Sequence, residues 1–149
     1  MGESSKQQRA EKIRTEYVKT LGEKGIQLRP TTSQVIFLTE TNKVVGIPSA
    51  SETARGREGG WWMGLPNEYF DFIILLCQRK NDAPLDFVLP RSFFEVLWKD
   101  DLYWQYQSSS WHVKFDVWRH EDDYQLKLKG RRRPPETIRR YLGNIEMLA

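Results

Sequence analysis

The sequence predicts a single α+β domain, built on a mixed β-sheet with helices near the N-terminus, in the middle and at the C-terminus. Residues 70–77, FDFIILLC, form a continuous apolar run with the length of a strand that is buried on both faces. An alternating apolar and polar pattern over residues 111–118 is typical of a half-buried strand. A chain of 149 residues can bury a core without a disulfide or a metal ion, so we take residues 1–149 as one domain.

The N-terminal helix is predicted by apolar residues that recur every three or four positions. These residues are Ala10, Ile13, Tyr17 and Leu21. Ser4 or Ser5 can cap the start of the helix, and Gly22 or Gly25 marks its end. Charges of both signs occupy the opposite face, which indicates a solvated surface.

Two short strands are expected after this helix, over residues 34–39 and 43–47, with a turn between them. Residues 49–60, SASETARGREGG, contain three glycines and few apolar side chains, so we expect a mobile loop there. The loop carries two candidate contacts for a polyanion, Arg55 and Arg57.

The apolar run at residues 70–77 is expected to be the middle one of three neighbouring strands. Residues 61–65 and 85–89 are short runs of strand-favouring residues before and after it. Prolines punctuate the ends of both runs, as they do at strand boundaries. These three segments should therefore form the centre of the sheet.

A middle helix and a β-hairpin are predicted after Pro90. Ser92 can cap the helix. The hairpin joins the strand over residues 111–118 to a partner over residues 124–129. Pairing apolar with apolar positions gives a register in which Asp116 faces Lys127 and Lys114 faces Lys129, with Trp118 pointing outward.

A last helix is predicted from Pro134 and Pro135 through Leu142. Proline is tolerated in the first turn of a helix, and Glu136 favours the helix start. Its apolar side would consist of Ile138, Tyr141, Leu142 and Ile145.

Composition excludes several common classes of site. His112 and His120 are the only histidines and Cys77 is the only cysteine, so no ordinary zinc site can form. The sequence has no glycine-rich phosphate loop and no G-x-S-x-G elbow. No apolar run approaches the roughly 20 residues of a membrane span. We therefore expect a cytoplasmic protein without a cofactor, a metal ion or a membrane contact.

Three polar residues of the predicted hairpin, Asp116, Gln125 and Lys127, share one face. With FD at residues 115–116 and QLK at residues 125–127, this arrangement resembles the PD-(D/E)xK nuclease superfamily. The resemblance implies a Mg²⁺-dependent nuclease in which the carboxylate binds the ion and the lysine stabilises the phosphate. Gln125 stands where an acid is usual and no proline precedes Asp116, so the active site is degenerate.

The order of the predicted elements is also similar to that of nuclease-like domains in restriction and defence proteins. A helix, two strands and a polar loop precede the strands over residues 70–77 and 85–90. The catalytic region would then fall near residues 33–52, where the sequence GIPSASE has no E-x-K. This resemblance implies a fold that has lost cleavage and kept recognition.

Basic residues gather at the C-terminus, where residues 125–149 have a net charge of +5 while residues 31–124 have −5. Arginine suits bidentate phosphate contact, and an outward Trp118 would offer a surface for stacking. We predict a non-catalytic nucleic-acid recognition module, with DNA favoured, that belongs to a restriction or defence system. The alternatives are the metal-dependent nuclease and an adaptor that binds a protein through the same basic face. The candidate contacts are Lys114, Trp118, Lys127, Lys129, Arg131, Arg132, Arg133, Arg139 and Arg140.

Overall fold

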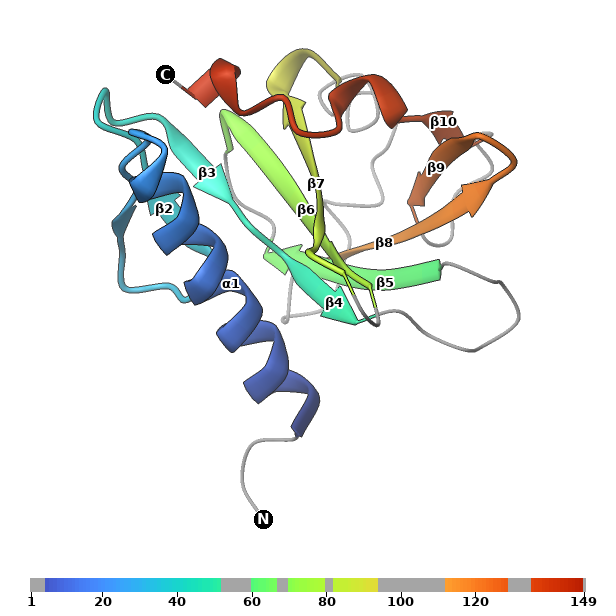
Figure 1. Cartoon of the computed structure of the whole chain (residues 1–149), viewed down its shortest axis with the longest axis horizontal. Coiled ribbons are helices and arrows are strands. Elements are labelled where there is room, and N and C mark those ends of the chain that lie inside the picture. The colour runs from blue at the N-terminus through green and yellow to red at the C-terminus, as the bar shows by residue number, and fades with distance from the viewer. Residues whose placement is uncertain are drawn as a thin grey trace.

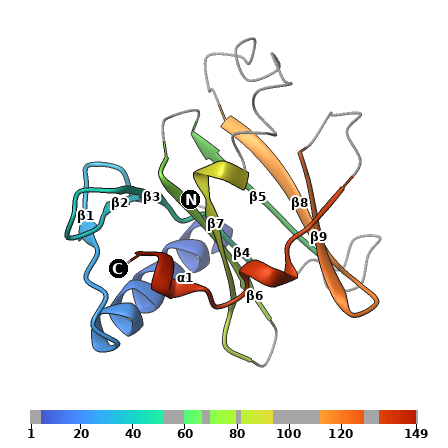
Figure 2. The ribbon, with the colours of Figure 1, turned by 90° about the horizontal axis from the view of Figure 1, so that it is seen from above.

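The computed structural model describes residues 5–51, 60–66, 70–79, 82–93, 112–128 and 135–148. Two β-sheets, A and B, pack face to face in this part of the chain. Helix α1 (Ser5–Glu23) covers the other face of sheet A (Figure 1, Figure 2). The predicted α+β class and mixed sheet are confirmed, and α1 has nearly the predicted bounds.

Sheet A is mixed because β6 has parallel neighbours on one side and an antiparallel neighbour on the other. β3 and β4 lie end to end along the same edge of β6, and Pro48, which has no N–H to donate, separates them. β7 pairs with the opposite edge of β6. The strands are β1 (Arg29–Pro30), β2 (Ile36–Leu38), β3 (Val44–Gly46), β4 (Ser49–Ser51), β6 (Phe72–Gln78) and β7 (Leu85–Pro90).

Sheet B is antiparallel, with the strand order β10, β9, β8, β5. Its strands are β5 (Gly60–Pro66), β8 (His112–His120), β9 (Asp123–Leu128) and β10 (Glu136–Thr137). The predicted hairpin is the β8–β9 pair. Its register is confirmed at Asp116, which lies directly opposite Lys127.

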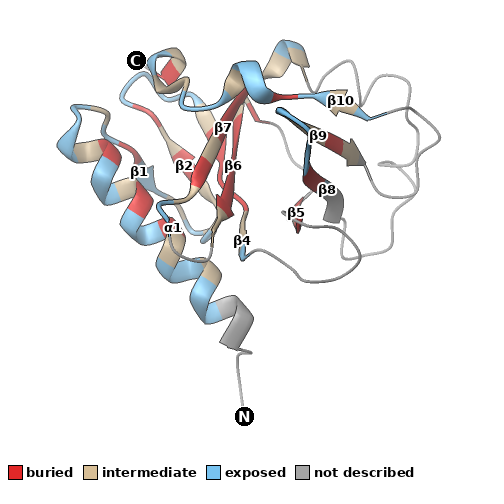
Figure 3. Cartoon of the chain, turned by 45° about the vertical axis from the view of Figure 1, so that its right-hand side comes forward, coloured by how far each residue is buried: buried red, intermediate tan, exposed pale blue. Residues whose placement is uncertain are grey.

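β6 is buried on both of its faces, as predicted (Figure 3). Ile73, Leu75 and Cys77 point into the core between the two sheets. Ile74 and Leu76 point into the second core, beneath α1. Burial raises the pKa of the Cys77 thiol, so this cysteine stays protonated and acts as a small apolar residue.

Polar contacts fix α1 on sheet A. The buried Arg14 donates from Nε to the carbonyl oxygen of Ile47 at 2.6 Å and from Nη2 to Ser49 Oγ at 3.4 Å. Burial lowers the pKa of Arg14. Tyr17 donates its hydroxyl proton to Asp86 Oδ2 at 2.8 Å. These bonds connect the helix to the break between β3 and β4 and to β7.

The predicted position of residues 61–65 beside residues 70–77 was wrong. This segment forms β5, which pairs with β8 in sheet B, from Gly60 opposite Trp118 to Pro66 opposite His112. Both edges of β6 are already occupied by β3, β4 and β7. Since each strand has only two edges, β5 is left to contact β6 across the core between the sheets.

The predicted C-terminal helix was also wrong. Glu136 and Thr137 pair with β9, and the N–H of Ile138 donates to the carbonyl oxygen of Tyr124 at 2.8 Å. Two short 3₁₀ turns follow, η2 (Arg139–Tyr141) and η3 (Ile145–Leu148), separated at Gly143, which has a φ of 69°. The backbone bonds to β9 replace those that a helix would use.

The predicted loop over residues 49–60 and the predicted middle helix lie partly within the described residues. The loop predicted over residues 49–60 is wrong at its ends, because Ser49–Ser51 form β4 and Gly60 begins β5. Residues 52–59 lie outside the described residues. Residues 91–93 are helical, which agrees with a middle helix beginning near Ser92, and the rest of that predicted helix also lies outside the described part of the chain.

Candidate nucleic-acid interface

Strand alternation gives sheet B an inner face, which packs on sheet A, and an outer face. The inner residues include Trp61, Met63, Leu65, Val117 and Leu126, each no more than 4% exposed. Successive side chains of a strand point to opposite faces. We call the residues between these positions, namely Trp62, Asp116, Trp118, Gln125 and Lys127, the outer face of sheet B.

A row of three residues crosses this outer face. Trp62 of β5 lies opposite Asp116 of β8, and Asp116 lies opposite Lys127 of β9. The side chain of Trp62 is 44% exposed, the larger of the two exposures recorded for big apolar residues among the described residues. An indole, a carboxylate and an ammonium group are therefore held side by side by strand pairing.

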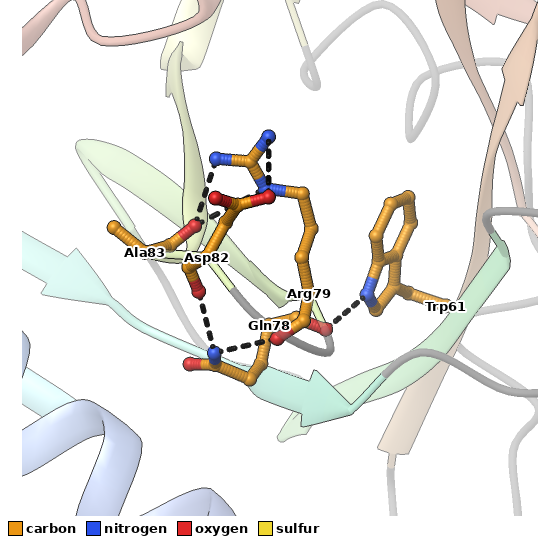
Figure 4. Close-up of polar contacts among 5 residues, drawn as sticks. All are labelled: Trp61, Gln78, Arg79, Asp82 and Ala83. Atoms are coloured by element: carbon orange, nitrogen blue, oxygen red, sulfur yellow. Dashed lines mark hydrogen bonds and ion pairs between the residues drawn. The ribbon is translucent and has the colours of Figure 1, made fainter.

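The orientation of Trp62 is fixed by its neighbour Trp61. The indole Nε1–H of Trp61 donates to the carbonyl oxygen of Gln78 at 2.9 Å, at the end of β6 (Figure 4). The side-chain amide of Gln78 in turn donates to the carbonyl oxygens of Arg79 and Asp82, which links the end of β6 to the residues before β7. Because Trp61 is fixed against β6, the alternation of β5 turns Trp62 away from the core.

Trp118, which we expected to present a stacking surface, is only 7% exposed. It lies opposite Gly60 of β5 and Gln125 of β9, on the outer face as predicted, but it is covered. The prediction that Trp118 offers an exposed ring was therefore wrong. Alternation along β8 gives the direction of a side chain, and the exposure depends on what packs over it.

The exposed aromatic residue of this face, Trp62, was missed from the sequence. The signal was present in GWWMGL, where Trp61, Met63 and Leu65 alternate with Gly60, Trp62 and Gly64. The sequence prediction places this segment beside residues 70–77 at the centre of the buried sheet, where both faces are covered. At the edge of sheet B the same alternation leaves Trp62 exposed and Gly64 partly exposed, while Gly60 is buried.

The nuclease-like triple does come together on the outer face. Asp116 and Lys127 are directly opposed, and Gln125 is two residues from Lys127 on the same side of β9. Among the described residues, no group of three His, Cys, Asp or Glu side chains could hold a metal ion. The triple itself offers one carboxylate and one amide oxygen, and Mg²⁺ held by so few protein oxygens would take its remaining ligands from water and phosphate.

The two arginines of η2 are exposed beside the tip of the hairpin. Arg139 donates from Nη1 to the carbonyl oxygen of Asp122. Arg140 places Cζ 4.9 Å from the centre of the Tyr141 ring, and its Nη2 donates to the Tyr141 hydroxyl at 2.9 Å. Both guanidinium groups therefore make contacts within the chain, and Arg139 sits at an acidic turn.

Several predicted contact residues lie outside the described part of the structure. For Lys114 the backbone is described, opposite Gly64, and its side chain is not. The remaining ones are Arg55, Arg57, Lys129, Arg131, Arg132 and Arg133. In the sequence the last four fall between β9, which ends at Leu128, and β10, which begins at Glu136.

Comparisons of the chain with models of known protein families, with curated proteins and with solved structures gave no match. No helix in the described ranges is long and apolar enough to cross a membrane.

Proposed function

We propose that this chain is a non-catalytic module that binds nucleic acid through the outer face of sheet B. The observation that carries the proposal is the row of Trp62, Asp116 and Lys127, which places an exposed ring and a cation on one rigid surface. Proteins that bind nucleic acid combine cations for the phosphates with aromatic rings for the bases.

The charges around this row indicate which end of β9 the nucleic acid would contact. Asp122 and Asp123 lie at the tip of the hairpin, at one end of β9. Lys127 lies near the other end, from which the chain continues into Lys129 and the arginines of residues 131–133. Phosphates would be repelled at the tip and attracted at the other end, so the nucleic acid would contact β9 near Lys127.

The resemblance to nuclease-like domains of restriction and defence proteins favours DNA as the ligand and a role in such a system. The single cysteine, buried and without a possible internal disulfide, suits the reducing cytoplasm. An adaptor that binds an acidic protein would use the same cations, without a need for the exposed ring.

Binding of the purified full chain to labelled single-stranded and duplex DNA and to RNA tests the proposal. We expect binding at low salt that weakens linearly in log[salt], because bound cations on the nucleic acid are released. Absence of binding to every probe at low salt would leave the adaptor as the better account.

A metal-dependent nuclease is the second candidate, favoured only by the opposition of Asp116 and Lys127. The same samples incubated with Mg²⁺ or Mn²⁺ should contain intact nucleic acid, because Gln125 stands in place of the second acid of the nuclease pattern and no cluster of three His, Cys, Asp or Glu ligands occurs among the described residues. Cleavage that depends on the metal and is abolished by Asp116→Ala would reverse the order of the two candidates.

A further inference from the structure

We propose that the ligand is a single-stranded nucleic acid and that Trp62 stacks on one of its bases. This inference rests on the proposed function and adds a class of ligand and a named contact. Its starting point is that a large aromatic ring, 44% exposed, lies on the outer face of β5, the edge strand of sheet B.

The backbone holds Trp62 on a rigid support. β5 is paired with β8 without a break from Gly60 to Pro66, and the bond from Trp61 to Gln78 anchors the preceding residue in the core. A ring on such a support loses little conformational freedom when a ligand binds, because only two side-chain torsions remain to be fixed. Trp62 is therefore preorganised as a platform.

Glycines flank Trp62 on its own side of β5. The residues two positions before and after Trp62, on the same side of the strand, are Gly60 and Gly64. Neither has a side chain to stand beside the indole. Gly60 is buried and lies opposite Trp118, whereas Gly64 is partly exposed, so a base would approach Trp62 from the Gly64 side of its strand.

The charges along the row orient a nucleotide chain. Adjacent strands are about 4.8 Å apart, so Lys127 on β9 lies about 10 Å from Trp62 on β5, with Asp116 between them. The carboxylate of Asp116 repels phosphate from the middle of the row, which leaves phosphate at the lysine and a base at the indole. The sugar-phosphate chain would then follow β9 while the bases extend toward β5.

This arrangement fits a single strand and excludes a paired one. The bases of a duplex are stacked on one another, so their flat surfaces cannot reach a ring fixed on a sheet face. An unpaired base can leave its neighbours and stack on the indole, and such contacts depend little on sequence because every base has a flat aromatic surface.

Substitution of Trp62 tests this inference by fluorescence anisotropy with a labelled single-stranded oligonucleotide and its duplex. The wild-type chain should bind the single strand more tightly. Trp62→Ala should weaken single-strand binding about 5- to 150-fold, the range for losing one base stack, and change duplex binding by less than about twofold. Trp62→Phe, which keeps a ring, should retain most of the affinity.

Two controls separate stacking from other effects. Leu142→Ala removes the second exposed large apolar side chain of the described residues, 38% exposed, and should leave binding unchanged. If Trp62→Ala unfolds, Trp62→Met takes its place, because it keeps apolar contact with the sheet without an aromatic ring. Equal loss in Leu142→Ala would contradict the inference.

The outcome also distinguishes this inference from the function on which it rests. Single-strand binding by Trp62→Ala that equals the wild type, or equal weakening on duplex, overturns the stacking contact and leaves nucleic-acid binding in place. Failure of the wild-type chain to bind any nucleic acid at low salt overturns both.

Discussion

Ile74→Asp is expected to abolish soluble folding. Ile74 is 0% exposed, at the centre of β6, with its side chain in the core beneath α1. Removing such a side chain costs about 2–5 kcal/mol, and an uncompensated buried carboxylate adds several more. Domains of this size are stable by only about 5–15 kcal/mol. Soluble yield, circular dichroism and a melting curve measure the result.

Two variants serve as controls for this experiment. Ile74→Val removes one methylene group, costs about 0.5–1.5 kcal/mol and should fold. Leu142→Asp introduces the same charge at an exposed position and should also fold. A soluble Ile74→Asp protein with a cooperative melting transition would show that β6 is not the centre of the core.

Replacing Arg131, Arg132 and Arg133 with Gln is expected to weaken binding to every nucleic acid tested. Each phosphate contact contributes a slope of about 0.9 in log K against log[salt] on duplex DNA and about 0.7 on a single strand. The triple variant should therefore flatten the slope by about two to three units. In the sequence these arginines fall between β9 and β10, which pair with each other in sheet B.

The matched control changes three exposed lysines near α1, Lys12, Lys19 and Lys24, to Gln. Net charge falls equally, but α1 covers the face of sheet A that is turned away from sheet B. The salt slope of this control should stay close to that of the wild type. Equal slopes in the wild type and the arginine variant would show that these arginines do not contact the phosphates.

Local patterns in the sequence were sufficient to predict α1, β6 and the β8–β9 hairpin. The alternation in β8 and β9 gave the correct pairing of Asp116 with Lys127, because a shift by one residue would have turned every apolar side chain outward. For β6, a run without polar residues indicates burial on both faces, and residues 73–77 are buried.

Features that depend on distant parts of the chain could not be predicted in this way. Consecutive strands often pair, yet β5 pairs with β8, far along the sequence, because both edges of β6 are occupied. This pairing exposes Trp62, while Trp118 on the same face is covered. At the C-terminus, a helical spacing of apolar residues was overridden by backbone bonds between β10 and β9.

The indole N–H signals of the protein test the central claim most directly. In a ¹⁵N-labelled sample of the full chain, replacement of single tryptophans by Phe assigns the signals of Trp61 and Trp62. Addition of a single-stranded oligonucleotide should shift the Trp62 signal. It should leave Trp61, which is 3% exposed and bonded to Gln78 on the inner side of the same strand, unchanged. Tight binding that leaves the Trp62 signal in place would show that the ligand does not bind the outer face of sheet B.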